Sequence, residues 1–143
     1  LALKESVKYA KAYLDQTARL DVQGIGGLRH DPVKVARLLR SLARNAATEV
    51  AIRTLAADAG GVDGALHPDT VSRYLQSLQR IFVLEVQEAL GPKLRTKTPL
   101  RESPKRHLVD SSLTCAALRV SAVNRLLADP ETLGLLFESF AIQ

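Results

Sequence analysis

The sequence predicts a mainly α-helical fold with one short two-stranded ribbon, and three observations support this prediction. Hydrophobic residues make up 46% of the 143 residues but aromatic residues only 4%, so Leu, Val, Ile and Ala have to build the core. Over residues 31–82 the apolar residues recur at the helical spacing of three and four. Near Phe82 the spacing changes to the alternation that is typical of strands. A chain of this length suits one core.

The expected helices can be placed one by one. Residues 3–20 form an amphipathic helix, which the segment GIGGLRH at residues 24–30 ends. Asp31 is a predicted N-cap, and Pro32 takes the first position of a helix that runs to about residue 46. A shorter helix covers about residues 49–59 and ends at Gly60 and Gly61. The next helix begins at Pro68.

The expected strands follow this last helix. The first strand covers Val83, Leu84 and Val86, and the second covers residues 107–109. Asp110 then caps a helix that starts near Leu113. Three helices followed by a two-stranded ribbon is the order of a winged helix-turn-helix, in which the helix from Pro68 is the recognition helix. We therefore expect a helical extension at 1–30, a winged helix at 31–110 and C-terminal helices at 111–143. The predicted shared core consists of Leu39, Leu42, Leu75, Leu78 and Phe82.

The net charge of +5 is concentrated in the expected wing. Residues 93–107 hold six basic residues and one acidic residue, and the rest of the chain holds 14 of each. Such a run can contact phosphate, but a solvated loop between two strands has the same composition, so both interpretations remain open. The outward face of the expected recognition helix adds two arginines. The predicted nucleic-acid contacts are Lys93, Arg95, Lys97, Arg101, Lys105, Arg106, Arg73 and Arg80.

The same residues argue against several chemistries. His30, His67 and His107 share no metal-ligand spacing, so a zinc site is not expected. Cys115 lies in an apolar stripe and is interpreted as a reduced core residue. No apolar run approaches the roughly 18 to 20 residues that cross a bilayer, so we expect a soluble, cytoplasmic protein without a membrane partner. Because Met is absent and the chain stops inside an apolar-periodic segment, we expect it to be a fragment.

Five segments carry a resemblance to a known family. They are YLDQTARLDV, DPVKVARLLRSLARNAATEV, TVSRYLQSLQRIFVLEV, SPKRHLVDSSL and LGLLFESFA. Together they resemble the C-terminal half of a large prokaryotic family of AAA-type P-loop ATPases. In that family the ATPase core is followed by a winged helix and then by a domain of unknown function, whose fold is related to restriction-endonuclease-like nucleases. His107 and Ser112 depart from the pattern, since relatives usually have an aromatic residue and a glycine there.

The resemblance implies that the nucleotide site lies upstream of this chain. No G-x-x-x-x-G-K-S/T motif is present, so ATP and Mg²⁺ are expected only in the missing part and no cofactor is expected in this fragment. Glu138 matches the first helix of the nuclease-like core but lacks partner carboxylates, so no catalytic or metal site is expected.

The leading hypothesis is a non-catalytic winged-helix module that couples the ATPase part to other domains of the same parent protein. The alternative is a nucleic-acid-binding regulator that uses the basic wing. A homo-oligomeric contact domain is a third possibility.

Overall fold

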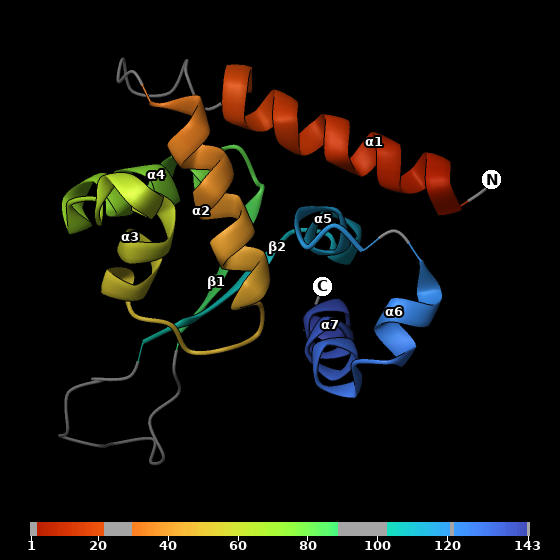
Figure 1. Ribbon diagram of the computed structural model, residues 1–143. Helices are drawn as coiled ribbons and strands as arrows, with labels where there is room; N and C mark the ends of the chain where they lie inside the picture. The colour runs from red at the N-terminus through yellow and green to blue at the C-terminus, as the bar shows by residue number, and fades with distance from the viewer. Residues whose placement is uncertain (1–2, 22–29, 89–102, 121, 143) are drawn as a thin grey trace, which may run out of the picture.

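The computed structural model describes residues 3–21, 30–88, 103–120 and 122–142. Helices dominate this part of the chain, and two strands form a small antiparallel sheet (Figure 1). The prediction of a mainly helical fold with one short ribbon is therefore confirmed. The predicted break at 24–29 and most of the expected wing, at 89–102, lie outside the described residues.

The N-terminal helix α1, Leu3–Gln16, continues as a π-helical turn, η1, Thr17–Asp21. Ala10, Leu14 and Ala18 on one face are buried and belong to the main core cluster. This face packs against α5, Ser111–Ala117, which comes from the far end of the sequence (Figure 1). The amphipathic helix predicted over residues 3–20 is confirmed.

Helix α2, Pro32–Arg44, starts where the sequence predicts. The Asp31 side chain accepts hydrogen bonds from the backbone N–H groups of Val33 and Lys34, at 2.9 and 3.5 Å. These bonds satisfy donors that the first helical turn leaves free. Figure 1 shows α2 between the α3 and α4 pair on one side and α5 on the other. Its apolar stripe is therefore covered from both sides.

Helix α3, Ile52–Gly60, begins three residues later than the predicted start at Glu49. Glu49 instead forms an isolated antiparallel bridge with Lys105, which keeps the backbone extended there. The helix ends at the predicted glycines. A Cβ at Gly60 would lie 2.8 Å from the Cα of Ala65, and Gly61 has a positive φ of 61°. A short 3₁₀ turn, η2, Gly61–Asp63, follows.

Helix α4, Pro68–Arg80, ends in a Schellman motif. The N–H of Val83 donates to the carbonyl of Leu78 at 3.0 Å, and the N–H of Phe82 donates to Gln79 at 3.0 Å. Phe82 takes the left-handed conformation in this motif, with φ 59°, and its side chain is 81% exposed. The prediction that Phe82 is buried is wrong, because the turn directs Val83 into the core instead. Leu39, Leu42, Leu75 and Leu78 are buried together as predicted.

The ribbon pairs β1, Leu84–Gln87, with β2, Lys105–Leu108, in antiparallel register. Asp110 then caps α5, since its side chain accepts from the N–H of Ser112 at 2.7 Å. Two further helices complete the described chain, α6 at Val123–Leu127 and α7 at Pro130–Ile142.

One hydrophobic cluster contains residues of every α-helix and both strands from α1 to α5. The division into three parts, at residues 30 and 110, therefore crosses a continuous core. That division stays a prediction.

Candidate functional site

The structure separates the eight predicted nucleic-acid contacts into three groups. Four of them, at 93, 95, 97 and 101, lie outside the described residues. Arg73 and Arg80 are exposed on the outer face of α4, as expected. Arg73 leans back on its own helix and donates to the carbonyl of Asp69 at 3.4 Å. Lys105 and Arg106 belong to β2, and their positions differ from the expectation.

Arg106 is buried, with 6% of its surface exposed. Its guanidinium donates to the carbonyl of Val50 at 2.8 Å, and its own carbonyl accepts from the N–H of Ala47 at 3.3 Å. Burial lowers the pKa of Arg106, while nearby Glu88 raises it. The expectation that Arg106 is available to phosphate is wrong, because strand alternation turns it toward the helices. It ties the ribbon to the connection between α2 and α3.

Lys105 lies on the opposite face of β2 and contacts α7. Its Nζ donates to Oε1 of Glu138 at 2.7 Å, and both side chains are partly exposed. A charge-assisted hydrogen bond of this length is strong for its type. Glu138 is therefore the ion-pair partner of a ribbon lysine.

His107 is the second ribbon residue that contacts α7. It is 1% exposed, and its Nδ1 lies 3.1 Å from the hydroxyl of Ser139, which is fully buried. Its Nε2 lies 3.3 Å from the amide oxygen of Gln87. Since an amide oxygen only accepts, this arrangement assigns the proton to Nε2, and the Ser139 hydroxyl donates to Nδ1.

Burial lowers the pKa of His107 from its ordinary value of 6.5. Glu138 and Glu85 act in the opposite direction and raise it, while Lys105 lowers it further. Burial is the largest effect, so the imidazole is held in its neutral form. A neutral, doubly hydrogen-bonded imidazole between a ribbon and a helix is a packing contact.

The contact between β2 and α7 is narrow. On α7 only Leu136 and Ser139 are buried among the residues of the helix that the structure describes. Leu133, Phe137 and Phe140 are exposed on its other sides. The two polar pairs from β2 therefore carry much of the attachment of α7 to the ribbon.

The other residues considered for chemistry lie apart. His30 is buried near α4, where its Nε2 lies 3.1 Å from the Ser77 hydroxyl, and His67 caps α4. Cys115 is half-buried, and burial raises the pKa of its thiol, which disfavours the thiolate. In the described ranges no three His, Cys, Asp or Glu side chains gather as a potential metal site.

Strand alternation was the signal that could have located this contact from the sequence. Residues i and i+2 of a strand share a face, so Lys105 and His107 lie together and Arg106 lies opposite. The sequence did not indicate which element covers each face. Glu138 and Ser139 come from a helix more than thirty residues downstream, and only the packing brings them to β2.

Comparison with known families finds a match over residues 2–124 to a family described as a domain of unknown function, DUF8612. This match covers most of the chain. The protein belongs to the DUF8612 family. No curated protein and no solved structure matches the sequence.

The DUF8612 match begins before α1 and ends at the second residue of α6. Helix α7 lies beyond it. The contacts of Lys105 and His107 with Glu138 and Ser139 therefore join the DUF8612 region to the segment that follows it. Among the described helices of this DUF8612 protein, none has the length and apolar character required to span a bilayer.

Proposed function

We propose that this DUF8612 domain is a non-catalytic winged-helix module of an AAA-type P-loop ATPase. In this proposal it couples the nucleotide-binding part of the parent protein to the domain that follows. The observation that carries the proposal is the double contact of β2 with α7, through Lys105 with Glu138 and His107 with Ser139. This contact joins β2, which lies inside the DUF8612 region, to α7, which follows that region.

The order of elements supports the winged-helix part of the proposal. Helices α2, α3 and α4 are followed directly by an antiparallel two-stranded ribbon. Arg106 anchors the ribbon, because its guanidinium donates to the carbonyl of Val50 in the connection between α2 and α3. The pairing of the two strands continues to Val109, whose N–H donates to the carbonyl of Val83 at 2.9 Å. A ribbon anchored on one face and attached to α7 on the other can transmit a displacement between the two.

The proposed parent carries the nucleotide chemistry elsewhere. This sequence contains no phosphate-binding motif of the P-loop type, so ATP and Mg²⁺ would bind upstream of Leu1. The sequence encoded upstream is the first test. A G-x-x-x-x-G-K-S/T motif after a predicted strand is expected there, and an upstream region without it would rule out this parent.

The second test measures ATP turnover of the longer protein with altered ribbon contacts. In the native pair Nζ of Lys105 lies 2.7 Å from Oε1 of Glu138. Lys105→Glu and Glu138→Lys each put two like charges at this contact, so each is expected to change the rate of ATP turnover severalfold. The double exchange restores an ion pair and is expected to restore turnover. The matched control is Lys34→Glu, because Lys34 forms an ion pair with Asp31 at 3.9 Å, at the start of α2. Unchanged turnover in both single variants would contradict coupling through this contact.

The alternative is a nucleic-acid-binding regulator, and the exposure of Arg73 and Arg80 on α4 favours it. Both residues lie on the face that a recognition helix presents to the groove. Replacing both with Ala is expected to weaken duplex binding only if α4 enters the groove. A fluorescence anisotropy titration of the double variant against the unchanged protein checks this.

A further inference from the structure

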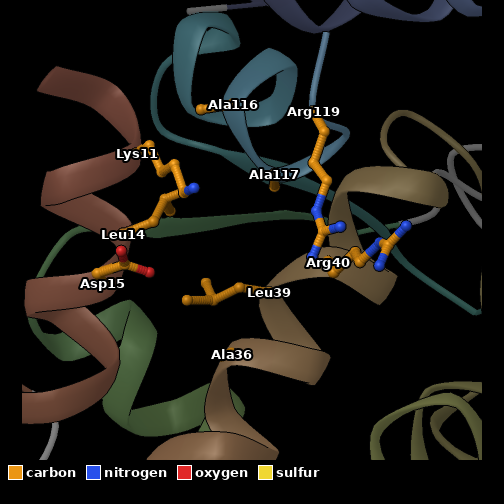
Figure 2. A pocket seen from close by; sticks show the side chains of 9 residues that line it. All are labelled: Lys11, Leu14, Asp15, Ala36, Leu39, Arg40, Ala116, Ala117 and Arg119. Atoms are coloured by element: carbon orange, nitrogen blue, oxygen red, sulfur yellow. The ribbon is translucent and has the colours of Figure 1, made fainter. Parts of the chain in front are cut away.

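Two adjoining hollows lie between α1, α2 and the end of α5. They have volumes of about 140 and 310 Å³ and share Asp15, Ala36, Arg40 and Arg119 in their lining. Figure 2 shows Arg40 of α2 and Arg119 from the end of α5 on one side of the smaller hollow, with Lys11 and Asp15 of α1 across from them. We call the two hollows together the α1–α2 groove.

The α1–α2 groove is strongly basic. Among the described residues of its lining, Asp15 is the one acid against five cations, which come from α1, η1, α2 and the turn after α5. Like charges that surround one hollow repel one another, and an anion between them removes this repulsion. The five cations are Lys11, Arg19, Arg37, Arg40 and Arg119.

Most of these cations lack a partner within the described part of the chain. Arg37 donates to the carbonyl of Gly60 at 3.0 Å and lies 3.6 Å from Asp63. The other four make no ion pair or side-chain hydrogen bond among the described residues, unlike Lys34, Lys105 and Arg106. No described residue therefore competes with a ligand for their donors.

The floor of the groove is apolar. Leu14 and Leu39 are buried beneath it, and Ala36, Ala116 and Ala117 line it. An apolar floor reduces local screening and so strengthens the attraction between the surrounding cations and an anion. The larger hollow is at the lower limit of ordinary ligand pockets, about 300 Å³, so it suits a small charged group.

Arg119 has a backbone conformation that favours glycine. Its φ is 58°, and it occupies the left-handed position of a Schellman motif, in which Val120 donates to Cys115 at 2.9 Å. Glycine would adopt this conformation without strain. The chain thus has an exposed arginine where glycine would be favoured, and this places a long cationic side chain at the edge of the basic groove.

We propose that the α1–α2 groove binds phosphate, carried by a small polyphosphate or by a nucleic-acid backbone. A phosphate monoester carries about 1.5 to 2 negative charges, whereas a carboxylate carries one, so it better matches the excess of cations. Guanidinium groups donate in pairs to phosphate oxygens, and Arg40 and Arg119 approach from different elements. This site is separate from the β2–α7 contact, and its test does not depend on the parent protein.

The test uses the full chain at low salt, about 50 mM. Calorimetric titration with inorganic pyrophosphate and fluorescence anisotropy with a short DNA duplex measure the two sources of phosphate. We expect R40Q and R119G each to weaken binding at least about tenfold. We expect R119G also to unfold at the same or a higher temperature, because glycine relieves the strain. The matched control is R53Q, which removes one exposed arginine of α3 outside the groove and should change binding less than about twofold.

The outcomes separate the sources and the alternatives. Loss of pyrophosphate binding in R40Q and R119G supports a small ligand, and loss of duplex binding alone supports a nucleic acid. The proposal is overturned if neither probe binds the unchanged chain, or if R53Q weakens binding as much as the groove variants. It is also overturned if polyglutamate binds as tightly as both phosphate probes. A chain in which Lys93, Arg95, Lys97 and Arg101 are replaced with Gln must still bind a phosphate probe. Adding R40Q to that chain must weaken this binding.

Discussion

Leu78 is fully buried on the inner face of α4 and belongs to the main core cluster. Its carbonyl also accepts the N–H of Val83, so the residue lies where the helix turns into the ribbon. Replacing it with Ala leaves a cavity, and Leu78→Ala is expected to lower the free energy of unfolding by about 2 to 5 kcal/mol. Urea unfolding measures this. A loss below about 1 kcal/mol, or a similar loss from exposed Gln79→Ala, would contradict the assigned packing.

Phe82 is the opposite case, since its ring is exposed and its backbone is strained. In the left-handed conformation a residue with a side chain is destabilised by about 1 to 2 kcal/mol, and glycine avoids this strain. Glycine also increases the freedom of the unfolded chain, which offsets part of the gain in stability. We expect Phe82→Gly to raise the free energy of unfolding by about 0.5 kcal/mol or more. Phe82→Ala keeps the strain and should change little. Destabilisation by Phe82→Gly would show that the ring packs in solution.

The ribbon shows how one element serves two contacts. Its alternation turns Arg106 and Leu108 toward the helices and turns Lys105 and His107 toward α7. Arg106 anchors the strand, because a buried guanidinium that donates to a carbonyl is costly to move. The ribbon is therefore held on both faces.

The ribbon contact with α7 predicts a pH dependence. The pKa of His107 is lowered in the folded chain, chiefly by burial, from an unfolded value near 6.5. Below that value the unfolded chain binds a proton that the folded chain does not, so stability is complete above it and falls as the pH decreases. The nearby groups are Glu138 on α7, Glu85 on β1 and Lys105 on β2.

His107→Gln removes this titration, so urea unfolding at a series of pH values should show a smaller loss of stability below about pH 6.5. A residual loss remains, because burial also lowers the pKa of His30. His30 is therefore the internal control, and a double variant should show a flatter profile still. An unchanged pH profile in His107→Gln would contradict a neutral, buried imidazole.

On the scale of the whole molecule, α1 packs on α5 and one core joins the elements from α1 to α5. The structure places two of the basic residues that the sequence assigned to the wing. Two of the six basic residues of the run at 93–107 are already engaged, since Lys105 pairs with Glu138 and Arg106 is buried. Four cations without an ion pair among the described residues line the α1–α2 groove.

This distribution sets an expectation for duplex binding. Each phosphate contact contributes a slope of roughly −0.9 to the dependence of log affinity on log salt. Replacing Lys93, Arg95, Lys97 and Arg101 together is expected to reduce that slope, because they are the other four basic residues of the run.

A salt titration of anisotropy with two unrelated duplexes checks this expectation. Weak binding that does not distinguish the duplexes, and that nearly disappears by about 150 mM salt, is expected. Tight binding to one duplex at that salt would favour the regulator over the coupling module.

The sequence alone predicted the starts of α2 and α4 and the change to strands, whereas α3 begins three residues after its predicted start. Asp31, His67 and Asp110 precede the first turns of α2, α4 and α5, and these boundaries depend on hydrogen bonds to residues two or three positions away. The apolar spacing likewise predicted the buried face of α4. Local structure of this kind follows from neighbouring residues, so a single sequence contains the information.

Only the tertiary structure decided which distant elements meet. The burial of Arg106, the pairing of Lys105 with Glu138 and the gathering of Arg40 and Arg119 depend on how separate elements pack. Phe82 is exposed because the Schellman turn directs Val83 inward, although the apolar spacing predicted Phe82 for the shared core. Charge and hydrophobicity are properties of a residue, whereas availability to a ligand is a property of its surroundings. Those surroundings are set by contacts that span the chain.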